Sequence, residues 1–282
     1  MDPQEPIIED VNQSTNAYIK KNDKFYIFLY VVIDLAAIAA IIYFQLSFVC
    51  LMVPLGITLA GYTHVQSKIR KEFLQQYATS IGFTYSPTGS LDSVQGRFFQ
   101  TGHSQLVYDV FTGIHEGRAS RIFCFNFTVG SGKSAHTYTF TVFETSFASV
   151  MPDITLIDVD LGELSAELSG IERVRLEGDF NKYFTLMVPK GYEIEAYQIF
   201  TPDVMTDLID RAQKLCFEFC GDKLYICALK IMTNRQDFDR IFSLTSYLDD
   251  LLAKNVADMK VYTPAELAEN GTSGNRGSGS FL

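Results

Sequence analysis

Two runs of sequence decide the fold of the larger part of this chain. Residues 121–129 read RIFCFNFTV, and residues 136–143 read HTYTFTVF. Both runs alternate with a period of two and are rich in β-branched and aromatic residues, and a glycine-rich turn over 130–134 separates them. A third run at 106–112, LVYDVFT, is followed by a turn over 113–117. The sequence therefore predicts an antiparallel meander.

The sequence after the meander predicts strands mixed with helices. Further strands are expected at 154–159, 174–176 and 183–188, with a last hairpin of 215–220 and 224–230 turning at Gly221 and Asp222. Helices are expected at 161–168, from an N-cap at Thr201 to about 214, and at 236–254, and a short helix or turn is expected at 192–200. A sheet with one polar face needs helices over its apolar face. The fold class predicted is α+β, a mostly antiparallel-sheet domain with flanking helices.

Two apolar runs precede this domain. Residues 25–44 read FYIFLYVVIDLAAIAAIIYF, and residues 46–65 read LSFVCLMVPLGITLAGYTHV. Each has about 20 residues, the length that crosses a bilayer as a helix. The sequence therefore predicts an N-terminal transmembrane helical hairpin over 20–66, with the lipid bilayer as its partner. A cleaved signal peptide fits less well, because the apolar stretch is too long and lacks a small-residue cleavage pattern.

Positive charges predict the orientation of that hairpin. Lysines precede the first run and basic residues follow the second, whereas the connecting turn carries none; the basic residues are Lys20, Lys21, Lys24, Lys68, Arg70 and Lys71. The positive-inside rule then predicts a multi-pass protein of the cell (inner or plasma) membrane with both termini in the cytoplasm. The very short turn leaves open a hairpin that enters one leaflet without crossing.

The domain organisation follows from these segments. Apolar residues recur every four positions from Val65 to Ile81 and stop at Gly82, which predicts a helical stalk over 67–82. The cytosolic α+β domain is expected over 83–262. Polar, low-complexity tails at 1–19 and 263–282 are predicted to be disordered.

Composition excludes some classes of function. The formal net charge of −10 disfavours binding to nucleic acid, because an acidic domain repels phosphate backbones and no basic patch interrupts it. Five cysteines without framework spacing argue against a secreted disulfide scaffold and fit a reducing compartment.

The sequence GSGKS at 130–134 resembles the end of a phosphate-binding P-loop. That motif needs a glycine where this chain has Phe127, and it needs a helix afterwards, because loop amides and a helix N-terminus hold the phosphates. A strand follows here instead. The segment is interpreted as a hairpin turn.

Other candidate residues also have structural interpretations. Cys216, Cys220 and Cys227 lack a fourth zinc ligand, and the interpretation favoured is buried or half-buried reduced thiols. The alternative is that Cys216 and Cys227 face each other across the predicted hairpin as a redox-sensitive thiol pair. The four histidines, His64, His103, His115 and His136, lie in no nucleophile motif. The acids Asp153, Asp158, Asp160, Glu163 and Glu167 fit a solvated edge better than acid–base chemistry. No catalytic, cofactor-binding or metal-binding residue is predicted, and no cofactor.

Asp34 interrupts the first apolar run. A carboxylate at that depth is costly in a bilayer and is often functional. No basic partner lies in either run. The interpretation favoured is a helix–helix hydrogen bond or a protonated acid in an oligomer interface, and proton or ion handling is the alternative.

Two motifs carry a resemblance to a known family. Residues 177–184 read EGDFNKYF and residues 200–205 read FTPDVM. This pattern, with the order of segments over roughly 20–230, resembles a bacterial family of membrane-anchored proteins of unknown function. The resemblance implies a two-span segment and stalk before an α+β domain. It implies no reaction and no functional residues.

Two hypotheses for function remain. The first is a membrane-anchored cytosolic interaction or assembly module that binds a protein partner at a sheet edge or a groove between sheet and helix. The alternative is a membrane-bound enzyme with an unrecognised active site. Clustering in space of His103, His136, Cys124 or the acids of 153–167 would favour the enzyme.

Overall fold

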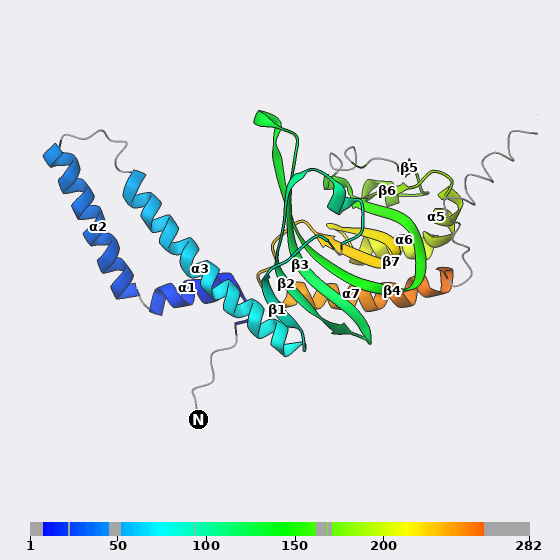
Figure 1. Ribbon diagram of the computed structural model, residues 1–282, viewed down its shortest axis with the longest axis horizontal. Coiled ribbons are helices and arrows are strands. Elements are labelled where there is room, and N and C mark those ends of the chain that lie inside the picture. Colours follow the sequence, from blue (N-terminus) through cyan, green and yellow to red (C-terminus); the bar gives the residue numbers. More distant parts are fainter. Residues whose placement is uncertain are drawn as a thin grey trace, which may run out of the picture. The chain divides into compact units, whose positions relative to one another are not determined.

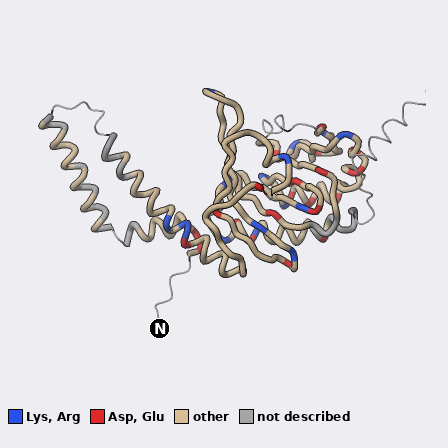
Figure 2. The backbone as a smooth tube through the Cα atoms, in the orientation of Figure 1, with Lys and Arg blue, Asp and Glu red and all other residues tan. Residues whose placement is uncertain are grey.

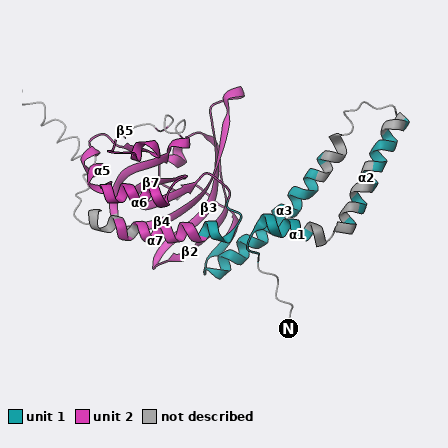
Figure 3. Cartoon of the chain, turned by 180° about the vertical axis from the view of Figure 1, so that it is seen from behind, with its two compact units in different colours: residues 1–85, 232–238 teal, residues 86–231, 239–282 magenta. Residues whose placement is uncertain are grey.

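The computed structural model describes residues 8–21, 23–44, 52–92, 94–161, 168 and 171–256 (Figure 1). The chain divides into two compact units (Figure 3). The first comprises residues 1–85 with 232–238, and the second comprises 86–231 with 239–282.

The first unit is helical. Its helices are α1 (Val11–Lys21), α2 (Asp23–Phe44) and α3 (Met52–Ser80). The C-terminal half of α3 buries Phe73 and Tyr77, whose rings pack against Phe238 with centroids 6.0 and 4.8 Å from it. Gly82, at φ +73°, ends the helix with the left-handed residue that such ends favour.

The transmembrane helical hairpin predicted over 20–66 is wrong. Among the described residues, no helix is both long enough and apolar enough to cross a membrane. Within the described residues, the sequence of α3 turns polar from Thr63 onward. In α2 a carboxylate, Asp34, stands within the apolar run.

The N-terminal tail also differs from the prediction. Residues 1–19 are expected to be disordered, yet α1 (Val11–Lys21) begins within that range. Val11 and Thr15 are buried, and Asp10 forms a β-bridge with Asn234. Apolar contacts and backbone pairing thus order a segment whose composition is polar. The C-terminal tail predicted at 263–282 lies outside the described residues.

The second unit is built on a seven-stranded sheet whose described pairings are antiparallel. The strands are β1 (Thr84–Thr88), β2 (His103–His115), β3 (Arg118–Val129), β4 (His136–Asp158), β5 (Glu172–Val174), β6 (Phe184–Val188) and β7 (Leu215–Ala228). Their order is β1-β2-β3-β4-β6-β5, and β7 pairs with β4 off this path. The predicted meander and the α+β class are confirmed.

Two strands are longer than the sequence predicts. The separate strands expected at 136–143 and 154–159 are parts of one strand, β4, which continues through Pro152. The hairpin expected at Gly221 is likewise one strand, β7, paired with β4 on both sides of that glycine. The register shifts where Met151 faces Gly221. A bulge absorbs the turn-forming residues there and bends both strands.

Both faces of the sheet are covered. The helices are α5 (Glu193–Ile199), α6 (Pro202–Arg211) and α7 (Arg235–Val256), and α6 and α7 lie along one face (Figure 1). Leu208 of α6 and Leu248 of α7 line a small interior space with Phe217 and Phe219 of β7. The opposite face carries an aromatic cluster, which includes Phe98, Phe99, Phe123, Phe125, Phe127, Phe140 and Tyr225.

Candidate binding groove between two helices

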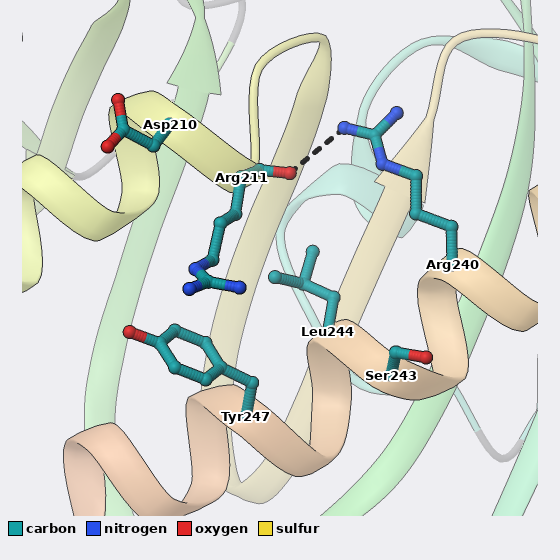
Figure 4. A pocket seen from close by; sticks show the side chains of 6 residues that line it. All are labelled: Asp210, Arg211, Arg240, Ser243, Leu244 and Tyr247. Carbon is teal, nitrogen blue, oxygen red and sulfur yellow. Dashed lines mark hydrogen bonds between the residues drawn. The ribbon is translucent and has the colours of Figure 1, made fainter.

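A surface groove lies between α6 and α7. The sequence sets up both walls: α6 begins with Pro202 and turns Val204 and Leu208 inward, while α7 buries Leu244 and Leu248. The groove has a volume of about 440 Å³ (Figure 4). Its lining residues are Asp210, Arg211, Arg240, Ser243, Leu244 and Tyr247.

Arg211 is held at the last turn of α6. Its guanidinium lies over the Tyr247 ring, with Cζ 4.5 Å from the ring centroid, and its Nε is 3.8 Å from Oδ1 of Asp207. A hydrogen bond to Asp207 raises the pKa of the Tyr247 hydroxyl, which is therefore protonated at neutral pH. The stack and the ion pair orient the Arg211 guanidinium before any ligand arrives.

Arg240 joins the two walls of the groove. Its Nη2 donates a hydrogen bond of 2.9 Å to the carbonyl oxygen of Arg211, near the C-terminus of α6 (Figure 4). That carbonyl is among the groups that a helix end leaves without an intrahelical partner. The bond uses one of the five guanidinium donors. Arg240 is exposed, so its charge is available at the groove.

The groove can hold an anionic group next to an apolar one. The two guanidinium groups lie on either side of Leu244 (Figure 4), and guanidinium groups bind carboxylates through charge-assisted hydrogen bonds. Asp207 and Asp210 lie beside them. Charges of both signs are also interspersed along the second unit (Figure 2). Mixed charge suits a polypeptide segment better than a polyanion.

The structure confirms the turn interpretation of residues 130–134. Gly132–Ser134 form a short 3₁₀ turn between β3 and β4, and Gly130 has a φ of +76° that favours glycine. The segment that follows is β4, not a helix. The phosphate-binding alternative therefore lacks the helix N-terminus that it needs.

The thiol pair has a different geometry from the prediction. Cys216 and Cys227 lie in one strand, β7, rather than on two strands of a hairpin, and both are buried and free. Burial raises the pKa of Cys216 to about 12 and that of Cys227 well above its usual value. Both thiols are therefore protonated at neutral pH and poor nucleophiles. Within the described ranges, no three His, Cys, Asp or Glu side chains converge as metal ligands.

The histidines of the sheet make local contacts. His103 contacts the carbonyl oxygen of Gly130 through Nε2 at 3.0 Å, and the His136 ring packs on Tyr138. The His115 ring lies 4.6 Å from the ring of Phe242. Each contact is one that a structural or surface histidine makes.

The acidic residues after position 152 differ from one another in burial. Asp153 is half-buried and lies 3.6 Å from the Arg97 guanidinium. Asp158 is buried and accepts hydrogen bonds from the amides of Asp160 and Lys214. The prediction of a solvated edge therefore fails for Asp158, which caps a turn. Glu163 and Glu167 lie outside the described residues, as does the side chain of Asp34.

Packing accounts for the motifs that carry the family resemblance. Phe180 is buried against the rings of Phe184 and Phe200, at 5.2 and 6.2 Å between centroids. The Asn181 side chain bonds both the amide and the carbonyl of Leu176. These residues build one corner of the second unit, so their pattern reports on fold rather than on a site.

Sequence reasoning missed both arginines of the groove and a buried carboxylate, Glu218. The run CFEFC at 216–220 carried a signal, because a strand that is apolar on both faces leaves no exposed position for its single acid. Arg211 and Arg240 carried no comparable signal, since they are far apart in the sequence and meet only when α6 packs beside α7.

Comparisons with known proteins identify no family for this chain. No family model matches it, and no curated protein is similar enough to count as a relative. A solved structure, the crystal structure of the mycobacterial trehalose monomycolate transport factor A, TtfA, matches with a TM-score of 0.48 and 16% sequence identity. The match covers 64% of this chain and 92% of that one. Likeness at this level carries no inference about what this chain does.

Proposed function

We propose that the chain is an interaction module whose α6–α7 groove binds a segment of a partner protein. The segment carries a carboxylate beside an apolar side chain. The carboxylate pairs with Arg211 and Arg240, and the apolar side chain packs on Leu244.

The observation that carries this proposal is the pre-organisation of the two guanidinium groups. Arg211 is fixed by its stack on Tyr247, and Arg240 by its bond to the Arg211 carbonyl oxygen. Fixed side chains lose less conformational entropy when a ligand binds. Arginine and tyrosine are also the residue types that dominate binding energy at protein interfaces.

A peptide-display selection tests the proposal. Random peptides displayed on phage are selected against the full-length chain, and the recovered peptides are titrated by fluorescence polarisation. We expect acidic residues next to apolar ones, and a Kd that rises tenfold or more in Arg240→Ala, because a charge-assisted bond contributes about 1.5–3 kcal/mol.

Lys190→Ala is the matched control, since Lys190 is an exposed cation that does not line the groove. It should leave the Kd unchanged. Selected peptides whose affinity is the same in Arg240→Ala and in the parent chain would place binding elsewhere and remove the proposal.

We also propose that α2 contacts a lipid bilayer surface. Phe25 and Phe28 are 65% and 67% exposed, and Leu35 is 61% exposed on the same helix. Large exposed apolar side chains in a row mark an interaction site. Lys20, Lys21 and Lys24 precede or begin this helix in the sequence, and lysines near an apolar helix favour a membrane interface.

Flotation with liposomes checks the lipid proposal. The full-length chain should float with phosphatidylcholine vesicles, and better with vesicles that also contain anionic phosphatidylserine. Phe25→Ser combined with Phe28→Ser should reduce the floated fraction, whereas Ile194→Ser, at an exposed apolar residue of α5, should not. Equal flotation of all three chains would contradict a role for α2.

Among the described residues, the side chains named for the enzyme alternative make structural contacts. Cys124 is buried within the sheet, and Asp158 is engaged by backbone amides. The groove holds no thiol or imidazole. Interaction therefore remains the function that the site supports best.

A further inference from the structure

Helix α5 presents apolar side chains close to the groove. Its inner face is buried at Ala196 and Ile199, whereas Ile194 is 68% exposed and Tyr197 is 53% exposed. Ile194 and Tyr197 are three positions apart, so they lie on one side of the helix. α5 ends at Ile199 and α6 begins at Pro202, which places these two helix ends at most about 11 Å apart. The exposed side of α5 and one wall of the groove are therefore neighbours on the second unit.

An acidic side chain accompanies these apolar residues. Glu193 directly precedes Ile194, and its Oε1 accepts a hydrogen bond of 3.2 Å from the Gly191 amide. That bond orients the carboxylate and uses only one of its roughly four acceptor positions. Glu195 follows Ile194, but its Oε2 is buried. Glu193, Ile194 and Tyr197 together form what we call the α5 ridge, an oriented carboxylate beside exposed apolar side chains.

The α5 ridge matches the groove between α6 and α7 in chemistry. Arg211 and Arg240 lie on either side of Leu244 in the groove (Figure 4). Guanidinium groups bind carboxylates through paired, charge-assisted hydrogen bonds. Glu193 supplies the opposite charge, and Ile194 supplies an apolar side chain of the size that packs on leucine. The two surfaces are therefore complementary in charge and in polarity.

We propose that the partner of the groove is a second copy of this chain, which inserts its α5 ridge there. Because ridge and groove are neighbours on the same unit, a two-fold axis brings the ridge of each copy onto the groove of the other. Glu193 of each copy pairs with the two arginines of the other, and Ile194 packs on Leu244. This inference rests on the proposed function of the groove and names its partner.

The acidic character of the chain is compatible with this contact. The net charge of −10 makes two copies repel each other at long range. At physiological ionic strength this repulsion is screened beyond about 8 Å, whereas a carboxylate and a guanidinium in contact are closer than that. A two-fold contact also occupies both ridges and both grooves, so association stops at the dimer.

Sedimentation equilibrium of the full-length chain measures the dimer. A mild non-ionic detergent is included, so that the exposed apolar side chains of α2 do not drive association. We expect a Kd in the micromolar range. Glu193→Arg and Arg240→Glu should each raise this Kd about a hundredfold, because each places like charges together at both contacts and costs about tenfold at each. Lys133→Glu reverses an exposed cation in the β3–β4 turn, so it is the matched control and should leave the Kd unchanged.

Mixing the two charge-reversed variants is the decisive measurement. In a dimer of one Glu193→Arg copy and one Arg240→Glu copy, the substituted positions meet with opposite charges at one contact. The other contact keeps both original residues. The mixture should therefore dimerise with a Kd within about threefold of that of the parent chain. Misfolded variants would not recover by mixing, so this recovery distinguishes a lost contact from a lost fold.

Two results would overturn the proposal. One is a parent chain that stays monomeric up to about 200 µM, and the other is a mixture that stays monomeric although the parent dimerises. The selected peptides keep this outcome apart from the proposed function. If Arg240→Ala weakens peptide binding to a monomeric parent chain, the groove still binds a protein segment and only the second copy is excluded. If the parent dimerises as expected, the same peptides should compete with the α5 ridge and shift the measured mass toward that of the monomer.

Discussion

Helix α2 and strand β3 are both rich in phenylalanine, yet they place these residues in opposite environments. In β3, Phe123 and Phe127 are fully buried, whereas in α2 Phe25 and Phe28 are about two-thirds exposed. The strand has a paired neighbour on each side and covered faces, whereas the two rings of α2 remain largely exposed. Phenylalanine rings therefore favour burial in both elements, but they are buried only where other parts of the fold pack against them.

The largest expected difference between β3 and α2 is in the loss of stability when a phenylalanine is removed. Phe123→Ala should lower the free energy of unfolding by about 3–5 kcal/mol, because it removes a buried ring and leaves a cavity. Phe28→Ala should change it by less than about 0.5 kcal/mol. Urea denaturation followed by far-ultraviolet circular dichroism measures both, since the chain has no tryptophan for fluorescence. Similar losses in the two variants would show that the Phe28 ring is buried in solution.

Ion pairs allow the same comparison between buried and exposed positions. Arg121 and Glu144 face each other across β3 and β4 and are largely buried, whereas Asp179 and Lys182 form an exposed pair. Glu144→Gln should cost about 2 kcal/mol, because it leaves the Arg121 charge without its carboxylate in a poorly hydrated site. Asp179→Asn should leave the free energy of unfolding nearly unchanged, because both partners are exposed to solvent. Salt titration sharpens the test, since only the exposed pair should be screened by 0.5 M NaCl.

The smallest effect concerns side-chain hydrogen bonds to backbone. Asn181→Ala should cost about 1 kcal/mol, because two backbone groups of Leu176 lose their partner. Thr206→Ala, which removes an exposed bond to the Pro202 carbonyl in α6, should cost a few tenths of a kcal/mol at most. Equal losses of unfolding free energy in the two variants would mean that water replaces the Asn181 side chain as the partner of Leu176 at no cost in stability.

The sequence predicted strands well where alternation was clean, and poorly where the sheet bends. β3 and the first part of β4 carry the period of two, so their positions followed from pattern, whereas β2 extends beyond the expected 106–112 and its register shifts between Tyr108 and Phe111. In β4 and β7, Pro152 and Gly221 suggest chain breaks, because these residue types usually form turns. They sit instead at a register shift between two paired strands. Only the pairing itself distinguishes a bulge from a turn.

The groove between α6 and α7 could not be predicted from the sequence, because it also depends on contacts between distant segments. α6 and α7 were both expected from capping and helical spacing, and both exist. Their relative placement depends on how each packs on the sheet, and this packing brings Arg240 to the Arg211 carbonyl oxygen. Spacing within a helix predicts which face is buried, but not which residue of another helix lies beside it.

The long pairing of β4 with β7 has a consequence for co-translational folding. β4 begins at residue 136, and the strand that completes its pairing ends only at residue 228. Until that strand is synthesised, β4 has no partner on one side and exposes a strand edge. Non-local pairing of this kind slows folding and leaves intermediates open to aggregation. The nascent chain should therefore depend on chaperones until β7 has left the exit tunnel.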